Sequence, residues 1–179
     1  MVDTPTRQRW IGRGSFLLLC FALVFFHLLP LSTMPPRWAP PDFLLALTLA
    51  WTVRRPDLVP VGSVAVVFFL TDMLFQRPPG LMTALVLLVT EGLRARSSSM
   101  RTLPFPLEWL TVSFAIVGLV FLNRAALLIV MADRAPLTPT VIQMVMTILA
   151  YPLVVMLSYL IFGVHRPAQG EVDAFGRPV

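Results

Sequence analysis

Charged side chains are scarce in this chain, and lysine is absent from it. Asp, Glu, Lys and Arg together make up 13% of the 179 residues, whereas 57% are hydrophobic. Soluble domains are typically about 25% charged and about 45–50% apolar. A soluble protein of this length could not bury so much apolar surface in one core. The composition therefore excludes an ordinary soluble domain and predicts an all-α polytopic membrane protein.

Cysteine and histidine are too few for a disulfide framework or a familiar metal site. The one cysteine, Cys20, lies inside an apolar run, so an intramolecular disulfide is excluded. The two histidines, His27 and His165, are separated by most of the chain and fit no metal-ligand spacing. No glycine-rich phosphate cradle is present, and no serine has a credible base nearby. The sequence therefore predicts a protein without a catalytic, cofactor or metal site.

The positive net charge does not indicate a nucleic-acid partner. The formal charge is +5, and every basic residue is an arginine. These arginines lie between apolar runs and form no dense basic stripe of the kind that phosphate binding needs. The predicted partners are therefore membrane lipids and other proteins, with no nucleic acid.

What the chain does contain is a series of six apolar runs. A helix needs about 20 apolar residues to cross a bilayer core. The runs lie at residues 15–32, 43–53, 58–75, 80–93, 107–131 and 140–163. The second, which could begin as early as Trp38, and the fourth are short. We predict a compact six-helix transmembrane bundle over residues 15–163, with a cytoplasmic segment at 1–14. The cytoplasmic polar tail at 164–179 is predicted to be disordered.

Arginine placement decides whether the short second run crosses the membrane. If all six runs cross and the N-terminus is cytoplasmic, ten arginines lie inside, three lie outside and one lies within the fifth run. If the second run were re-entrant, five would lie inside and eight outside. Since basic loops favour the cytoplasmic side, we predict six spans with both ends in the cytoplasm. The predicted inside set is Arg7, Arg9, Arg13, Arg54, Arg55, Arg94, Arg96, Arg101, Arg166 and Arg177.

A few polar residues lie within the apolar runs. Asp72 lies near the outer end of the third run, where a carboxylate needs a partner, water or a helix terminus to compensate its burial. Asn123 and Arg124 lie at a similar depth in the fifth run, so an Asp72–Arg124 ion pair is our specific hypothesis. The alternative is that Asp72 is wetted at the interface while Arg124 extends to the headgroups. Glu108, at the inner end of the fifth run, is expected to face cytoplasmic arginines or water.

The stretch from Pro41 to Arg94 resembles a known family. "PPDFLLALTLAWTVRRP", followed by "GSVAVVFFLTDMLFQRPPGLMTALVLLVTEGLR", is similar to the rod shape-determining protein MreD family. The likeness is carried by a Pro-Asp before a short apolar helix, an Asp in the next span, and a turn whose Gly opens another helix. These positions are Pro41, Asp42, Asp72 and Gly80. The chain has "VVFFLT" before its second Asp, where the family often has glycine.

The resemblance implies a function that composition cannot supply. Members of the family are non-enzymatic subunits in the bacterial inner membrane, where they belong to the complex that directs lateral peptidoglycan synthesis and cell shape. It implies as partners MreC, the actin-like MreB, RodA and a class B penicillin-binding transpeptidase. The family is similar in fold to the substrate-binding subunits of energy-coupling-factor vitamin transporters. By this likeness Asp72 is a packing and orientation residue at the periplasmic end.

A second function stays open at the level of sequence. The chain could be a small-molecule-binding subunit of a membrane transporter. That alternative predicts a polar pocket on the periplasmic side, formed by His27, Asp72, Asn123 and Arg124. A ligand held through purification would distinguish it from the interaction subunit.

Overall fold

The computed structural model describes residues 4–29, 39–100, 104–131 and 136–162. Within these ranges the chain is helical and contains no strand, which confirms the predicted all-α class. The predicted polar tail at 164–179 lies outside the described residues. The helices are α1 (Thr4–Leu28), α2 (Phe43–Arg54), the single 3-10 turn η1 (Pro56–Leu58), α3 (Val61–Leu74), α4 (Leu81–Met100), α5 (Phe105–Ile129) and α6 (Leu137–Phe162).

Three helices are long and apolar enough to cross a membrane. They are the part of α1 from Arg9 to Leu28, with 20 residues, α5 with 25 and α6 with 26. At about 1.5 Å per residue, each reaches the roughly 30 Å of a hydrocarbon core. Two further apolar helices, α2 and α3, are shorter, with 12 and 14 residues. The described chain is therefore that of a helical protein with three helices that could cross a membrane.

The lengths of α3 and α4 differ from the prediction. The fourth run was expected to end at Leu93, but α4 continues to Met100, so the fourth helix is not short. No proline interrupts it before Pro104, and alanine and arginine are good helix formers. The third helix is shorter than predicted because Pro60 stands at its N-cap and η1 precedes it. The arginines after Leu93 thus mark the end of the apolar run but not the end of helix α4.

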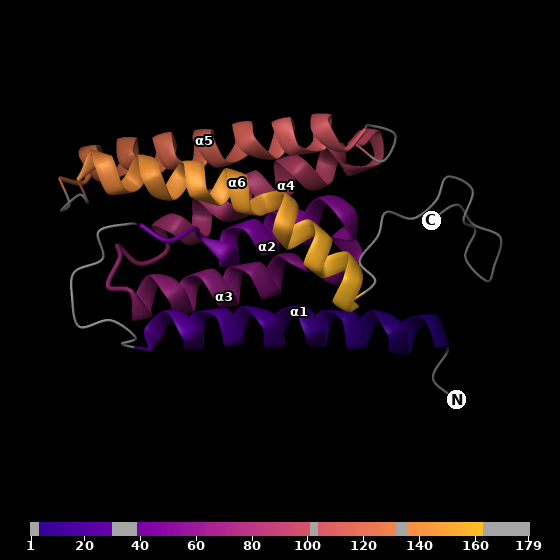
Figure 1. Cartoon of the computed structure of the whole chain (residues 1–179). Coiled ribbons are helices and arrows are strands. Elements are labelled where there is room, and N and C mark those ends of the chain that lie inside the picture. The colour runs from indigo at the N-terminus through magenta and orange to yellow at the C-terminus, as the bar shows by residue number, and fades with distance from the viewer. Residues whose placement is uncertain (1–3, 30–38, 101–103, 132–135, 163–179) are drawn as a thin grey trace.

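The short helix α2 forms the centre of the bundle. Nine consecutive residues, from Leu45 to Val53, are buried. A helix that is apolar on every side must be surrounded by other elements. It contacts α1, α4, α6 and η1, and it lies in the middle of the molecule in Figure 1. Ala46 and Ala50 are fully buried, as expected for small residues that let neighbouring helices approach.

Helix α6 bends where Pro152 interrupts its hydrogen bonds. Proline has no amide hydrogen, so the carbonyl of Ile148, four residues earlier, loses its donor within the helix. Trp109 of α5 supplies a replacement, because its indole Nε1 donates to that carbonyl at 2.9 Å. The bend of α6 is visible in Figure 1. A side chain on α5 thus satisfies the backbone group that the proline frees on α6.

Replacing Trp109 with phenylalanine should lower the free energy of unfolding by about 1–2 kcal/mol, because the Ile148 carbonyl would be left without its donor. In a Pro152→Ala background the new amide can donate to Ile148. The same Trp109 change should then cost about 1 kcal/mol less. Denaturant unfolding of the detergent-solubilised protein measures both values. An equal loss in the two backgrounds would contradict this account of the bend.

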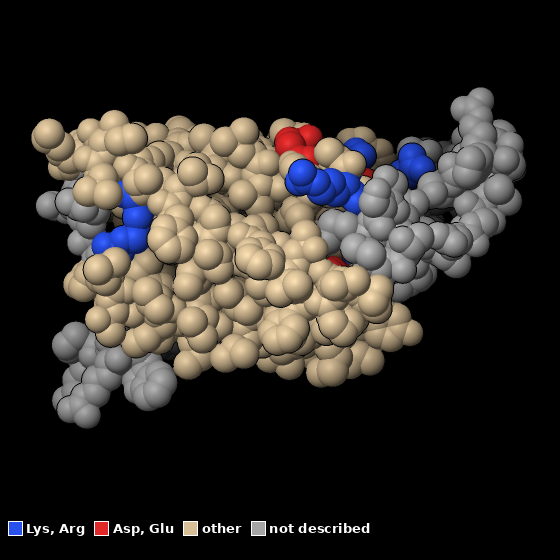
Figure 2. Space-filling model, turned by 90° about the horizontal axis from the view of Figure 1, so that it is seen from above, with Lys and Arg blue, Asp and Glu red and all other residues tan. Residues whose placement is uncertain are grey.

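Charged side chains gather at two ends of the molecule, with an uncharged band between them (Figure 2). Hydrogen bonds define one of these ends. Arg13 of α1 donates to the carbonyl of Asp57 in η1, and Arg94 of α4 donates to the carbonyl of Val59. Helix α1 begins and α6 ends at this same end in Figure 1. We call it the arginine end.

Candidate functional site

The carboxylate of Asp72 is buried, and hydrogen bonds from the start of α4 compensate the cost of removing it from water. Its side chain is completely buried. The carboxylate oxygen Oδ2 accepts three hydrogen bonds: from the backbone N–H of Gly80 at 3.1 Å, the backbone N–H of Thr83 at 3.1 Å and the hydroxyl of Thr83 at 2.8 Å. The first amides of a helix have no partner within it and carry a partial positive charge. Asp72 of α3 therefore caps the N-terminus of α4.

The predicted Asp72–Arg124 ion pair does not form. No ion pair between described residues joins the two side chains. Asp72 accepts its hydrogen bonds from the start of α4. Nη1 of Arg124 instead donates to the hydroxyl of Thr140 at 3.1 Å, which links α5 to α6. Of the three compensations that the sequence left open for Asp72, the helix terminus is the one observed. The sequence could not distinguish them because depth along a helix says nothing of which way its side chains face.

Gly80 occupies a backbone conformation that suits glycine. Its φ is +81°, in the left-handed region that L side chains adopt only with strain. Its amide is one of the donors to Asp72, so the conformation aims this N–H at the carboxylate. A second residue of the same turn, Gln76, has φ of +53° without being glycine. The turn between α3 and α4 is thus set by one glycine, one strained residue and the buried aspartate.

Gly80→Ala should lower the free energy of unfolding by about 1–2 kcal/mol, since an added Cβ strains a left-handed backbone. Gln76→Gly is the matched change in the same turn and should raise it by roughly 0.5–1 kcal/mol, because it relieves strain of the same kind. Thermal unfolding in detergent measures both. If both variants shifted stability in the same direction, the assignment of strain to this turn would be wrong.

Asp42 caps α2 and connects it to α6. Its carboxylate oxygen Oδ1 accepts from the backbone N–H of Leu45 at 2.9 Å, which is the usual role of an aspartate at an N-cap. Its own backbone N–H donates to the hydroxyl of Thr147 at 2.9 Å. The Pro-Asp pair before α2 thus fixes both the start of the central helix and its contact with α6.

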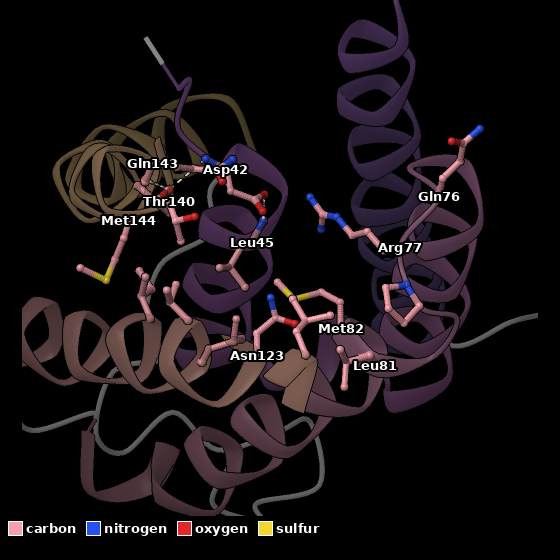
Figure 3. A pocket seen from close by; sticks show the side chains of 16 residues that line it. Asp42, Leu45, Gln76, Arg77, Leu81, Met82, Asn123, Thr140, Gln143 and Met144 are labelled. Atoms are coloured by element: carbon pink, nitrogen blue, oxygen red, sulfur yellow. Dashed lines mark hydrogen bonds between the residues drawn. The ribbon is translucent and has the colours of Figure 1, made fainter. Parts of the chain in front are cut away.

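A pocket of about 270 Å³ lies at the end opposite the arginine end. Its walls come from α2, the α3–α4 turn, α4, α5 and α6, and it is shown in Figure 3. The lining includes several polar side chains, whose neighbours in the wall are mostly leucine, isoleucine, valine and methionine. The principal polar members are Asp42, Arg77, Asn123, Thr140, Gln143 and Thr147.

This pocket differs from the one that the transporter alternative predicted. Asn123 lines it, as expected, but Asp72, Arg124 and His27 do not. His27 lies against the ring of Phe75, with 4.7 Å between ring centroids. Of the other polar lining residues, Asp42 had been named through the family resemblance, whereas Arg77, Thr140, Gln143 and Thr147 had not been singled out. Thr140, Gln143 and Thr147 lie within the first three turns of α6, and nothing in their local sequence marks them as pocket residues.

A buried ion pair lies at the arginine end. Glu108 of α5 is completely buried and accepts from Nε and Nη2 of Arg54 on α2, at 3.1 and 3.2 Å. The hydroxyl of Tyr151 on α6 donates to the same carboxylate at 2.7 Å. Of the two surroundings expected for Glu108, arginines or water, the structure shows an arginine, Arg54. This network joins α2, α5 and α6.

Taken together, these features define a class of protein. Each buried carboxylate, Asp72 and Glu108, is held by hydrogen bonds from other helices. Over the ranges that the structure describes, no group of three His, Cys, Asp or Glu side chains could hold a metal ion. The class is an all-helical protein whose buried polar groups join its helices and whose long apolar helices suit a membrane.

Comparison of the chain with protein-family models, curated proteins and solved structures found no match. The functional argument therefore depends on the residues and contacts described above.

Proposed function

We propose that this protein is a non-enzymatic, six-span subunit of the bacterial inner membrane, of the kind that the MreD family represents. In this proposal it belongs to the complex that directs cell shape and lateral peptidoglycan synthesis. Both ends of the chain are cytoplasmic, and the arginine end faces the cytoplasm. The hydrogen bonds that bring Arg13, Arg94 and the α2–α3 connection together support this orientation, because arginine-rich ends favour the cytoplasmic side.

The observation that carries the proposal is that the residues on which the family resemblance rests form hydrogen bonds at the starts of helices. Asp42 caps α2, Asp72 caps α4, and Gly80 presents its amide to Asp72. Each of these polar groups is bonded to the chain's own backbone at a helix start. Such residues set the positions of helices, which is what a subunit that offers a fixed surface to its partners requires.

The outer surfaces of the long helices suit contact with lipid or with partner spans. Large apolar side chains are exposed along them, among them Leu18, Phe25, Phe114, Phe121 and Leu160. Membrane lipids cover such faces, and helices of other subunits replace lipid where they pack. The proposed partners are an MreC-like protein with one span and a periplasmic domain, together with MreB, RodA and a class B penicillin-binding transpeptidase.

Affinity purification from the native bacterium in mild detergent, followed by mass spectrometry, tests this function. A single-span periplasmic protein recovered in stoichiometric amount would support it. Asp72→Ala should reduce that recovery more than Asp57→Ala, a matched aspartate change at the arginine end. Recovery of an ATPase module with a bound vitamin-like compound would overturn the proposal.

Cysteine labelling tests the orientation separately. The native Cys20 is fully buried, so it gives little background. A cysteine at exposed Pro79, between α3 and α4, should react with a membrane-impermeant maleimide added to intact spheroplasts. A cysteine at exposed Arg96 should react only after the membrane is opened. The reverse pattern would contradict the proposed topology.

One observation favours the second candidate, a small-molecule-binding subunit of a transporter. It is the pocket of about 270 Å³ between α2, α4, α5 and α6. Under that candidate a ligand in this pocket would be transferred across the membrane by associated subunits. Uptake of a labelled compound that depends on this chain would support the candidate, and the purification above separates it from the first.

A further inference from the structure

The pocket at the end opposite the arginine end has a positive and a negative side chain on facing walls. Arg77 comes from the α3–α4 turn, and Asp42 comes from the start of α2. Figure 3 shows their charged groups directed toward each other across the pocket, whereas Gln76 points away from it. Among the described residues no ion pair joins them, so they lie further apart than the 3.1–3.3 Å of the ion pairs present. Each charge therefore faces the pocket without an ion-pair contact to the other.

Both charged residues are held at the backbone. The N–H of Arg77 donates to the carbonyl of Asp72 at 3.0 Å, and its guanidinium lies 5.3 Å from the ring centroid of Phe75. Asp42 is fixed by Thr147 and uses only Oδ1 to cap α2. Its other oxygen, Oδ2, has no hydrogen-bond partner within the described chain. A cation and an anion thus line the same pocket, each from a backbone position fixed by hydrogen bonds.

The remaining lining is amphipathic. Asn123 and Gln143 add amide groups that can donate and accept hydrogen bonds. Most of the remaining wall is apolar, with Leu81, Ile116 and Met144 among its members. A volume of about 270 Å³ corresponds to roughly nine water molecules at about 30 Å³ each. The pocket can accept a polar headgroup and the adjoining atoms, but not two complete acyl chains.

We propose that this pocket binds the headgroup of a zwitterionic phospholipid of the phosphatidylethanolamine type. The phosphate lies on Arg77, whose planar guanidinium matches phosphate oxygens with two hydrogen bonds. The ammonium group lies on Oδ2 of Asp42 as a charge-assisted hydrogen bond. The acyl chains leave along the apolar surface. An anionic lipid such as phosphatidylglycerol satisfies Arg77 but has no cation for Asp42, so it binds more weakly.

Native mass spectrometry of the full-length protein in dodecyl maltoside tests this assignment. Dioleoyl-phosphatidylethanolamine and dioleoyl-phosphatidylglycerol are added separately to delipidated protein. The wild type should bind the ethanolamine lipid about tenfold more tightly, a difference of about 1.4 kcal/mol. Asp42→Asn keeps a good helix cap and should remove this preference. Arg77→Gln should weaken binding of both lipids.

Control variants at the arginine end show whether a change in lipid affinity comes from the pocket or from the loss of any charged side chain. Arg96→Gln and Glu91→Gln should leave both affinities within about twofold of wild type. Equal binding of the two lipids by the wild type, or the same behaviour from Asp42→Asn and Glu91→Gln, would overturn the proposal. Free phosphoethanolamine should compete only weakly. If it bound more tightly than the lipid, the site would belong to a soluble zwitterion instead.

Discussion

Replacing Arg54 with methionine should be one of the most destabilising single changes in this protein, with a loss of about 3 kcal/mol in the free energy of unfolding. The reason is that Arg54 donates two hydrogen bonds to Glu108, whose side chain is 0% exposed. Removing the guanidinium leaves a buried carboxylate with much less compensation. Denaturant titration of the detergent-solubilised variant measures the loss.

The adjacent arginine supplies the control for this prediction. Arg55 pairs with Asp57, but these side chains are 28% and 35% exposed, so water already solvates them. Arg55→Met should therefore cost about 0–1 kcal/mol. The double variant Arg54→Met with Glu108→Leu should recover most of the loss, because neither charge then remains buried. Equal losses from Arg54→Met and Arg55→Met would show that the buried pair is not what stabilises this end.

Asp72→Ala should lower the free energy of unfolding by about 3 kcal/mol. Three hydrogen bonds to Oδ2 are lost at roughly 1 kcal/mol each, and the first amides of α4 lose their cap. Asp72→Asn should cost about 1 kcal/mol, because its amide oxygen can still accept from Gly80 and Thr83. Thermal unfolding in detergent compares the two variants. If asparagine were as damaging as alanine, the negative charge itself would be required.

A double variant distinguishes this arrangement from an ion pair across the bundle. Arg124 donates to Thr140, so its role is separate from that of Asp72. The losses from Asp72→Asn and Arg124→Gln should therefore add, to within about 0.5 kcal/mol. A double variant no less stable than the worse single variant would instead support coupling between the two charges.

The location of the helices was largely predictable because hydropathy is a local property. A run of apolar residues must leave water wherever it lies, so the runs around α1, α5 and α6 could be found without a structure. The end of α4 was not predictable in this way. Arginine and serine after Leu93 end the apolar character, but they do not end the backbone hydrogen bonding of a helix.

The candidate sites were predictable only in part. Asp72 and Asn123 could be singled out as polar residues within apolar runs, and Asp42 and Gly80 through the family resemblance. Their partners could not be assigned, since a partner depends on the rotation of each helix about its own axis. The opposition of Asp42 and Arg77 across a pocket had no signal in the sequence, because the two residues lie on different helix ends.

The amino-acid sequence by itself determined that this protein is helical, that its long apolar helices suit a membrane, and that its arginines cluster between particular runs. These properties follow from the hydropathy and charge of the side chains in each segment, which do not depend on the rest of the chain. Tertiary structure alone decided that Asp72 caps α4, that Glu108 meets Arg54, and that Trp109 serves the bend of α6. A buried polar group takes whichever partner the packing brings within hydrogen-bonding distance, and packing is a property of the whole chain.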